Sequence, residues 1–285
     1  MEIHETYNRW KVDAIQFYFG LPGGLIVPGA SKFGGNPDLP ADFIWPSYTA
    51  EDGKTRPLAF LVQVDCEQIF ALDVDGLLPR TGRLYFFYDI QTEPTGCKPE
   101  HRGGCYVHYD HSDPAKLISF PAPDDLPKSF LFPEIPLRFE NVPDLPGEEY
   151  LPLYMDEDFV REYHGKKLYD LQASLGVEPS GRCKLLGYPN AIRGDMLTQC
   201  ALTAGRDLST EGDLPPMTDQ QRQELREDAM DWMLLLQLDS LRIDSQLCEK
   251  FSLNFGRSGR LFIYIRRHDL ALRRFDRCWC ILQSY

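Results

Sequence analysis

The sequence predicts an α+β fold made of two similar halves, each with antiparallel strands and helices. Two observations carry this prediction. Four short segments recur in the same order along the 285 residues, which indicates an internal repeat. Strand-like and helix-like segments are both present, and a content of 43% hydrophobic and 12% aromatic residues is enough to build a buried core.

The repeat rests on matched landmarks rather than on long stretches of identity. A K-x-x-G-x-P pattern comes first in each copy, then an L-V/L-Q-V/L-D segment, then a Gly-Arg-Leu segment rich in aromatic residues. We expect residues 1–145 and 146–285 to form the two halves, packed as one compact domain. The matched segments are 32–37 with 184–189, 61–65 with 235–239, 81–88 with 258–265 and, less clearly, 105–109 with 278–282.

The strands are predicted from alternation and from β-branched and aromatic residues. Alternation in LAFLVQVD, residues 58–65, places Gln63 and Asp65 on one face of a strand. GRLYFFYD and GRLFIYIR each follow a Thr-Gly or Ser-Gly turn signal, and 105–109 and 278–283 suit as their antiparallel neighbours.

Helices and one irregular connector are predicted for the remainder of the chain. Residues 121–154 contain eight prolines, so we expect an irregular surface connection there. A helix is expected over about 156–175, between an N-cap at Asp156 and a stop at Gly176. Another begins at the capping box of Thr218 and Gln221, and its apolar face is predicted to contain Leu225, Ala229, Trp232, Met233 and Leu236.

The net charge of −13 argues against nucleic acid or an anionic membrane as a partner. Residues 1–150 have a balance of −11 and residues 151–285 one of −2. Seven arginines within 257–277 are a local exception, expected to form either a solvated face or, less readily, an anion or partner site. The polar start of the chain and eight scattered cysteines favour a cytoplasmic protein with reduced thiols.

Several segments of the sequence, taken in order, resemble the bacterial YwqG-like family. SKFGGNPDLP with Trp45-Pro46, PLAFLVQVD and GLLPRTGRLYFFYD carry the resemblance in the first half. LLGYPNAIRGDM, WMLLLQLDS, GRSGRLFIYIRRHDL and WCILQSY carry it in the second. The resemblance implies an α+β protein of two similar halves, and an association with toxin and immunity genes for some members. It implies no activity.

Common catalytic signatures are missing from the sequence, and we expect no cofactor. The chain has no phosphate-binding loop, zinc helix, nucleophile elbow or dinucleotide fingerprint. Residues 97–111 combine cysteines and histidines, the ligands that zinc prefers, but strand alternation would separate them, so a polar hairpin tip is the favoured interpretation over a metal site. The weak candidate ligands are Cys97, His101, Cys105 and His108.

Three pairs of polar residues match between the halves and are the main candidates for a site. Lys32 and Lys184 suit an anion or a Schiff base, or else they cover apolar surface beside an acidic neighbour. The carboxylates suit acid–base work or a cation, or else they cap strand ends. Asp195 is a cap or a further cleft residue, and Trp45 and Trp232 are pocket walls or core. The paired candidates are Lys32, Gln63, Asp65, Lys184, Gln237 and Asp239.

The first hypothesis for function is a non-catalytic binding protein. It would engage a basic protein partner through its acidic surface, as an immunity protein engages a toxin. The alternative is an enzyme or a small-ligand protein with a site in the cleft between the halves, which requires the matched residues to converge in one pocket.

Overall fold

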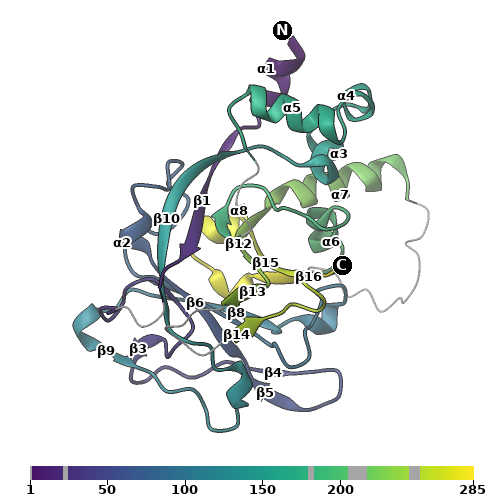
Figure 1. Ribbon diagram of the computed structural model, residues 1–285. Coiled ribbons are helices and arrows are strands. Elements are labelled where there is room, and N and C mark those ends of the chain that lie inside the picture. The colour runs from purple at the N-terminus through teal and green to yellow at the C-terminus, as the bar shows by residue number, and fades with distance from the viewer. Residues whose placement is uncertain (1, 22–24, 179–182, 205–216, 244–250) are drawn as a thin grey trace.

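The fold is organised around one ten-stranded antiparallel sheet (Figure 1). The computed structural model describes residues 2–21, 25–178, 183–204, 217–243 and 251–285. The strand order from edge to edge is β16-β15-β12-β11-β1-β10-β2-β6-β7-β8. The strands are β1 (Val12–Phe19), β2 (Lys32–Phe33), β6 (Ala59–Asp65), β7 (Arg83–Tyr88), β8 (Cys105–Asp110), β10 (Ile135–Asp144), β11 (Lys184–Leu186), β12 (Trp232–Asp239), β15 (Arg260–Arg266) and β16 (Trp279–Gln283).

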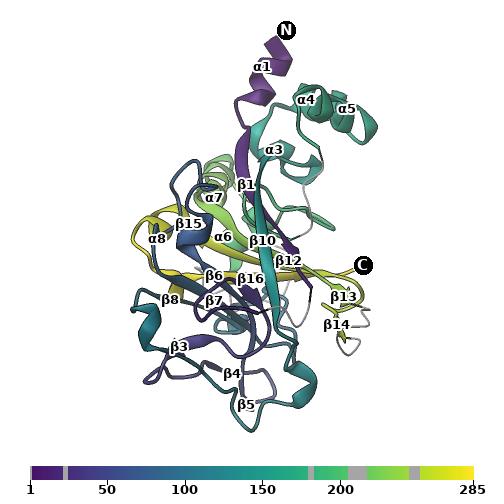
Figure 2. The same ribbon diagram turned by 60° about the vertical axis from the view of Figure 1, so that its left-hand side comes forward.

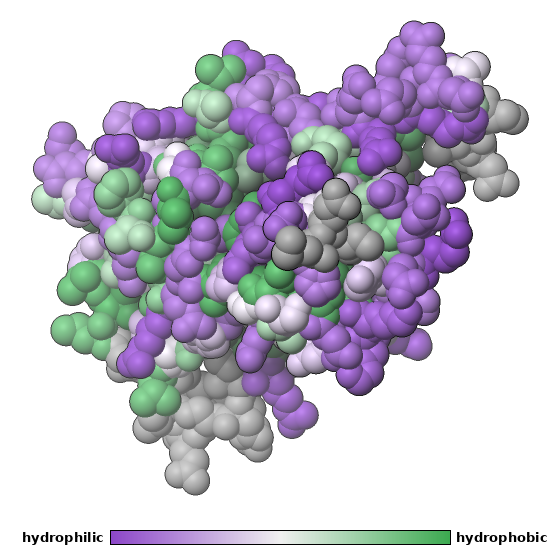
Figure 3. All heavy atoms as spheres, turned by 90° about the horizontal axis from the view of Figure 1, so that it is seen from above, coloured by the Kyte–Doolittle hydropathy of each residue, from purple (hydrophilic) through white to green (hydrophobic). Residues whose placement is uncertain are grey.

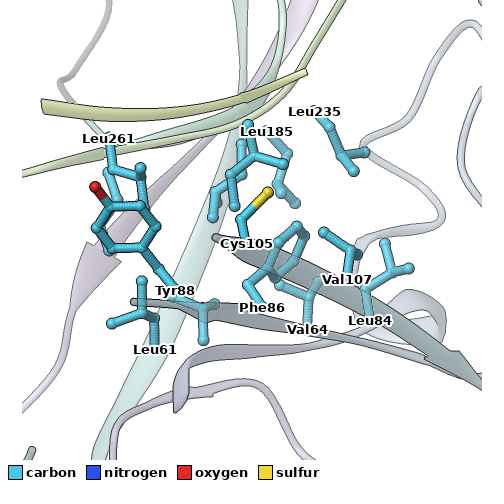
Figure 4. Packing of buried hydrophobic residues seen from close by; sticks show 14 of the residues in the cluster. Leu61, Val64, Leu84, Phe86, Tyr88, Cys105, Val107, Leu185, Leu235 and Leu261 are labelled. Atoms are coloured by element: carbon cyan, nitrogen blue, oxygen red, sulfur yellow. The ribbon is translucent and has the colours of Figure 1, made fainter. Parts of the chain in front are cut away.

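The main core lies between two halves of this sheet that pack face to face. The first half contains β2, β6, β7 and β8, and the second contains β11, β12, β15 and β16. Figure 4 shows side chains of β6, β7 and β8, such as Val64, Phe86 and Val107, opposite Leu235 and Leu261 of β12 and β15. These residues are buried and belong to one apolar cluster. The inner face is therefore close-packed, and the halves do not enclose an open cleft there.

Each half of the sheet is covered on its outer face by different elements. Over the first half lie two small sheets, and Trp45, between β3 and β4, packs on Phe87 of β7. They are β3 (Asp38–Pro40) with β9 (Leu117–Ser119), and β4 (Ser47–Thr49) with β5 (Thr55–Pro57). Over the second half lie α6 (Met196–Thr203) and α7 (Asp219–Asp231). Three further elements on the sheet are α2 (Cys66–Ile69), α8 (Arg267–Ala271) and the hairpin of β13 (Leu241–Ile243) with β14 (Phe251–Leu253).

A helical lobe, residues 2–11 and 145–178, sits at one end of the paired strands β1 and β10 (Figure 2). Val12 at the start of β1 pairs with Asp144 at the end of β10, so the chain enters and leaves the lobe at the same point. Tyr7, Met155 and Phe159 belong to a separate apolar cluster inside it. Its helices are α1 (Glu2–Asn8), α3 (Leu151–Tyr154), α4 (Glu157–Glu162) and α5 (Lys166–Ser174).

Most sequence predictions about the elements are confirmed. The fold is α+β, the four landmark strands are present, and segments 105–109 and 278–283 are the antiparallel neighbours of β7 and β15. Thr218 and Gln221 form the capping box. Asp156 caps α4, but the helix expected over 156–175 is two helices, because the chain turns at Gly165 with a φ of 53°.

Two predictions about local structure were wrong. The proline-rich connector contains β10, which lies at the centre of the sheet. Its prolines are tolerated because neither needs an N–H for the sheet. The backbone of Pro136 faces the end of β1, where its carbonyl accepts from the Gly20 N–H, and Pro143 lies outside the stretch of β10 that pairs with β2. In addition, Trp232, Met233 and Leu236 belong to β12, since α7 already ends at Asp231.

Among the residues that the structure describes, no helix combines the length and the apolar character needed to cross a bilayer. The seven described cysteines are free thiols, and Cys248 lies outside the described residues.

Candidate functional site

Lys184 lies in a buried polar cluster. Its Nζ is 2.7 Å from the Asp144 Oδ2 atom, and its side chain has 0% exposure. Burial lowers the pKa of Lys184, while the neighbouring Asp144 carboxylate acts in the opposite direction. Gln237 of β12 lies opposite Lys184 of β11. The Gln237 side chain accepts from the backbone N–H of Asn190 and donates to the Asn190 Oδ1 atom. We call Lys184, Asp144, Asn190 and Gln237 the second polar cluster.

Lys32 lies in a similar cluster in the first half. Its Nζ is 3.0 Å from Asp38 Oδ2 and 2.9 Å from Glu134 Oε2. Gln63 of β6 lies opposite Lys32 of β2. Its side chain accepts from the Asp38 N–H and donates to the Asp38 carboxylate. Lys32, Asp38, Gln63 and Glu134 form the first polar cluster. In both clusters the glutamine fastens the turn after the lysine strand to the neighbouring strand.

The matched aspartates have local partners. The Asp65 carboxylate accepts from the Glu67 N–H and caps α2, and burial raises the pKa of Asp65. Asp239 accepts from the Ser240 N–H and lies 3.3 Å from Arg260 Nε. Asp195 caps α6 by accepting from Leu197 and Thr198, and burial raises its pKa as well. These bonds support the strand-end and capping interpretation.

The two clusters do not meet in one pocket. Strands β10 and β1 lie between β2, which carries Lys32, and β11, which carries Lys184. Three inter-strand steps correspond to about 14 Å, beyond the reach of either side chain. Lys32, Gln63, Lys184 and Gln237 are all buried. Each glutamine accepts from a backbone N–H of the turn after its lysine, so each cluster stabilises its own turn. The convergence that a shared active site would need is not seen.

The four weak metal candidates have different surroundings. The exposed Cys97 thiol accepts from Gln199, and Cys105 belongs to the main core. His101 accepts from the Gly96 N–H at Nδ1 and contacts Glu51 through Nε2. His108 packs against Phe43, and burial lowers its pKa. Within the described part of the chain, no group of three or more potential ligands could hold a metal ion.

A family model described as a domain of unknown function, DUF1963, matches residues 31–284. This span covers most of the chain, from β2 to the last residue but one. The chain belongs to the DUF1963 family. A search of curated proteins finds no match.

The arginine-rich segment of this DUF1963 protein is largely engaged with acidic or aromatic neighbours. Arg260 pairs with Asp239, and Arg266 pairs with Asp228 while lying 4.7 Å from the centre of the Trp232 ring. Arg273 lies over the Tyr109 ring. Trp45 donates to the Leu58 carbonyl, so both tryptophans considered from the sequence are part of local packing.

The hollows of the helical lobe were missed by the sequence argument. One of about 660 Å³ is lined by Thr6, Met155, Phe159, Tyr163 and three carboxylates; we call it the α1–α4 hollow. A smaller one of about 220 Å³ is lined in part by Asp144, Glu149 and Glu178. The acidic run at 156–158 was a usable signal, but the sequence placed it only at a helix start.

The lobe is more acidic for its length than the protein as a whole. Residues 145–178 hold eight acidic and three basic residues, a balance of −5 within a total of −13. Each of the three basic side chains pairs with a carboxylate of the same lobe: Arg161 with Asp158, Lys166 with Asp170 and Lys167 with Glu162. Figure 3 shows that hydrophilic side chains dominate the face seen from the lobe end.

Proposed function

We propose that this DUF1963 protein is a non-catalytic binding protein that engages a basic protein partner through its helical lobe. The observation that carries the proposal is the acidic excess of residues 145–178, whose basic side chains are already paired within the lobe. Such a surface attracts a positively charged partner and speeds the encounter.

A binding role is favoured over catalysis because of the bonds that the matched residues make. The lysines, glutamines and aspartates that recur between the halves are engaged in two separate clusters that fix turns and strand ends. An enzyme or small-ligand site in a cleft between the halves would need them in one pocket. The packed core between the halves also argues against such a cleft.

Salt-dependent capture of partners tests the proposal. The full chain is immobilised and exposed to cell lysate at about 0.01 M and about 1 M salt, where the Debye length is about 30 Å and about 3 Å. We expect basic proteins to be captured at low salt, and to be lost in a variant with Glu148→Gln, Glu157→Gln and Asp170→Asn. Capture that is indifferent to both salt and these substitutions would refute the role of the lobe.

The resemblance to YwqG-like proteins narrows the partner to test first. Because some of those proteins are associated with toxin and immunity genes, we propose a basic toxin as that partner, and a bacterial cytoplasm as the setting. Binding of a purified basic toxin from the same cells, measured with the wild type and the lobe variant, would decide this point.

We also propose that the chain is internally duplicated, as the sequence repeat predicts. Three structural correspondences support it. Asp38 and Asn190 each lie six residues after the cluster lysine and each bond to the cluster glutamine. The second residue after each lysine has a positive φ, 62° at Gly34 and 59° at Leu186. The register shifts just before Gln63 and just before Gln237, at Phe60/Val62 and at Leu234/Leu236.

The registers favour exchange of the first strand between the two units. Lys32 faces Pro136 of β10, whereas Lys184 faces Gln16 of β1. The same correspondence matches Ile15, Phe17 and Phe19 of β1 with residues 135, 137 and 139 of β10, which are Ile, Leu and Phe. We therefore propose that the second unit begins at β10, somewhat before residue 146, and that each unit lends its first strand to the other.

A further inference from the structure

The α1–α4 hollow combines aromatic rings with carboxylates. Met155, Phe159 and Tyr163 contribute its apolar lining, and the rings of Phe159 and Tyr163 stack with their centroids 4.6 Å apart and their planes 25° apart. Phe159 is anchored from below by Tyr7 of α1, at a centroid distance of 5.3 Å. The aromatic part of the hollow is thus held in place by the core of the lobe.

Three carboxylates surround these rings. Asp156, Asp158 and Glu162 line the hollow, whereas no lysine or arginine is among its described lining residues. Arg161 of α4 pairs with Asp158, and Lys167 of α5 pairs with Glu162 and lowers the pKa of Glu162. Glu162 is therefore ionised at neutral pH. The three carboxylates outnumber the two basic side chains paired with them, so the hollow keeps a negative excess beside the half-buried Tyr163 ring.

We propose that the α1–α4 hollow is the docking site for an arginine-containing segment of the basic partner. A guanidinium group is planar, stacks on aromatic rings and donates several hydrogen bonds to carboxylates, so it matches both features of the hollow. The volume of about 660 Å³ lies within the range of about 300–1,000 Å³ that is typical of ligand pockets and far exceeds the needs of a metal ion. The inference rests on the proposed function and assigns it a site.

Peptide binding to the full chain tests the site. Fluorescence anisotropy with labelled nona-arginine and nona-lysine at low salt compares the wild type with Asp156→Asn/Glu162→Gln, in which Asn retains the helix cap. The matched control, Asp42→Asn/Asp75→Asn, removes the same charge from exposed positions outside the lobe. We expect a loss of about tenfold in nona-arginine affinity in the hollow variant and of less than about twofold in the control.

The aromatic contribution is tested at Tyr163. We expect Tyr163→Leu to reduce the preference for nona-arginine over nona-lysine by about threefold, and Tyr163→Phe to retain it, since phenylalanine keeps the ring. Thermal unfolding of every variant, followed by circular dichroism, confirms that each one is folded.

The possible failures are distinguishable. Equal losses in the hollow variant and the control overturn the site, while leaving a diffuse acidic surface as the basis of binding. No binding of either peptide to the wild type overturns the proposed function together with the site. Tighter binding of spermine than of nona-arginine in the hollow assigns it to small polyamines, and self-association that is lost in the hollow variant assigns it to a second copy; either result overturns the proposal.

Discussion

Replacing Lys184 with methionine removes one charge of a fully buried ion pair. Methionine has a similar length and an apolar body, so the main change is the loss of the ammonium group. The Asp144 carboxylate remains, with a side-chain exposure of 7%, and retains hydrogen bonds from the backbone N–H groups of Leu145 and Tyr188. The variant therefore leaves a buried charge without its counter-ion.

The expected loss of stability is about 3 kcal/mol. Removing one partner of a buried pair costs about 3–5 kcal/mol, and we take the lower end because the two backbone donors remain and because the buried Lys184 is itself desolvated. Lys32→Met should cost only about 1–2 kcal/mol. In that cluster Asp38 keeps donors from Gly29 and Gln63, and Glu134 is 42% exposed and regains water.

Urea unfolding monitored by tryptophan fluorescence measures both free energies of unfolding. The double variant Lys184→Met/Asp144→Asn should recover part of the loss, because the amide carries no charge and its oxygen can still accept a backbone bond. A loss of less than about 1 kcal/mol for Lys184→Met, or a larger loss for Lys32→Met, would show that the buried pair does not stabilise the second cluster as argued.

Three further predictions concern backbone strain, pH dependence and capping. Ser258, which is exposed and has a φ of 57°, should tolerate Ser258→Gly with a gain of about 0.5–1 kcal/mol in thermal unfolding. Burial lowers the pKa of His108, so the unfolded state takes up a proton first as the pH falls below about 6.5 and stability decreases. His108→Phe should therefore show a shallower decrease in the urea midpoint from neutral pH to about pH 5. Thr218→Ala should cost about 1 kcal/mol, and Thr218→Ser close to nothing.

Each of these has a contradicting outcome. A destabilised Ser258→Gly would mean that chain entropy outweighs the relief of strain. An unchanged pH dependence in His108→Phe would assign the acid sensitivity to carboxylates. Equal stability of Thr218→Ala and the wild type would show that α7 begins without help from its capping box.

Local sequence signals predicted the strands with strong alternation and the helix with an explicit cap. They failed where tertiary context decides. The prolines of β10 argue against a central strand until it is known that Pro136 faces the end of β1. Trp232 fits the helical spacing of Leu225 and Ala229 equally well, and only its pairing with Arg266 makes it part of a strand.

The candidate site shows the same limit. The sequence identified Lys32, Gln63, Lys184 and Gln237 as matched polar residues, and the structure places each lysine opposite its glutamine. Their distance across the sheet depends on the strand order, which no local pattern encodes. Two of the carboxylates that pair with the lysines, Glu134 and Asp144, were not identified, because Glu134 precedes the unpredicted strand β10 and Asp144 ends it.

The position of β1 has a practical consequence for anyone who trims this protein. The family match begins at residue 31, after β1 has ended, although β1 lies between β10 and β11 in the middle of the sheet. A fragment that starts at the family boundary would lack β1. Eight residues of β10 would lose their partner strand, and the edges of β10 and β11 that β1 covers would be exposed. Exposed edges of this kind template aggregation, so insolubility of such a fragment would say nothing about the stability of the whole protein.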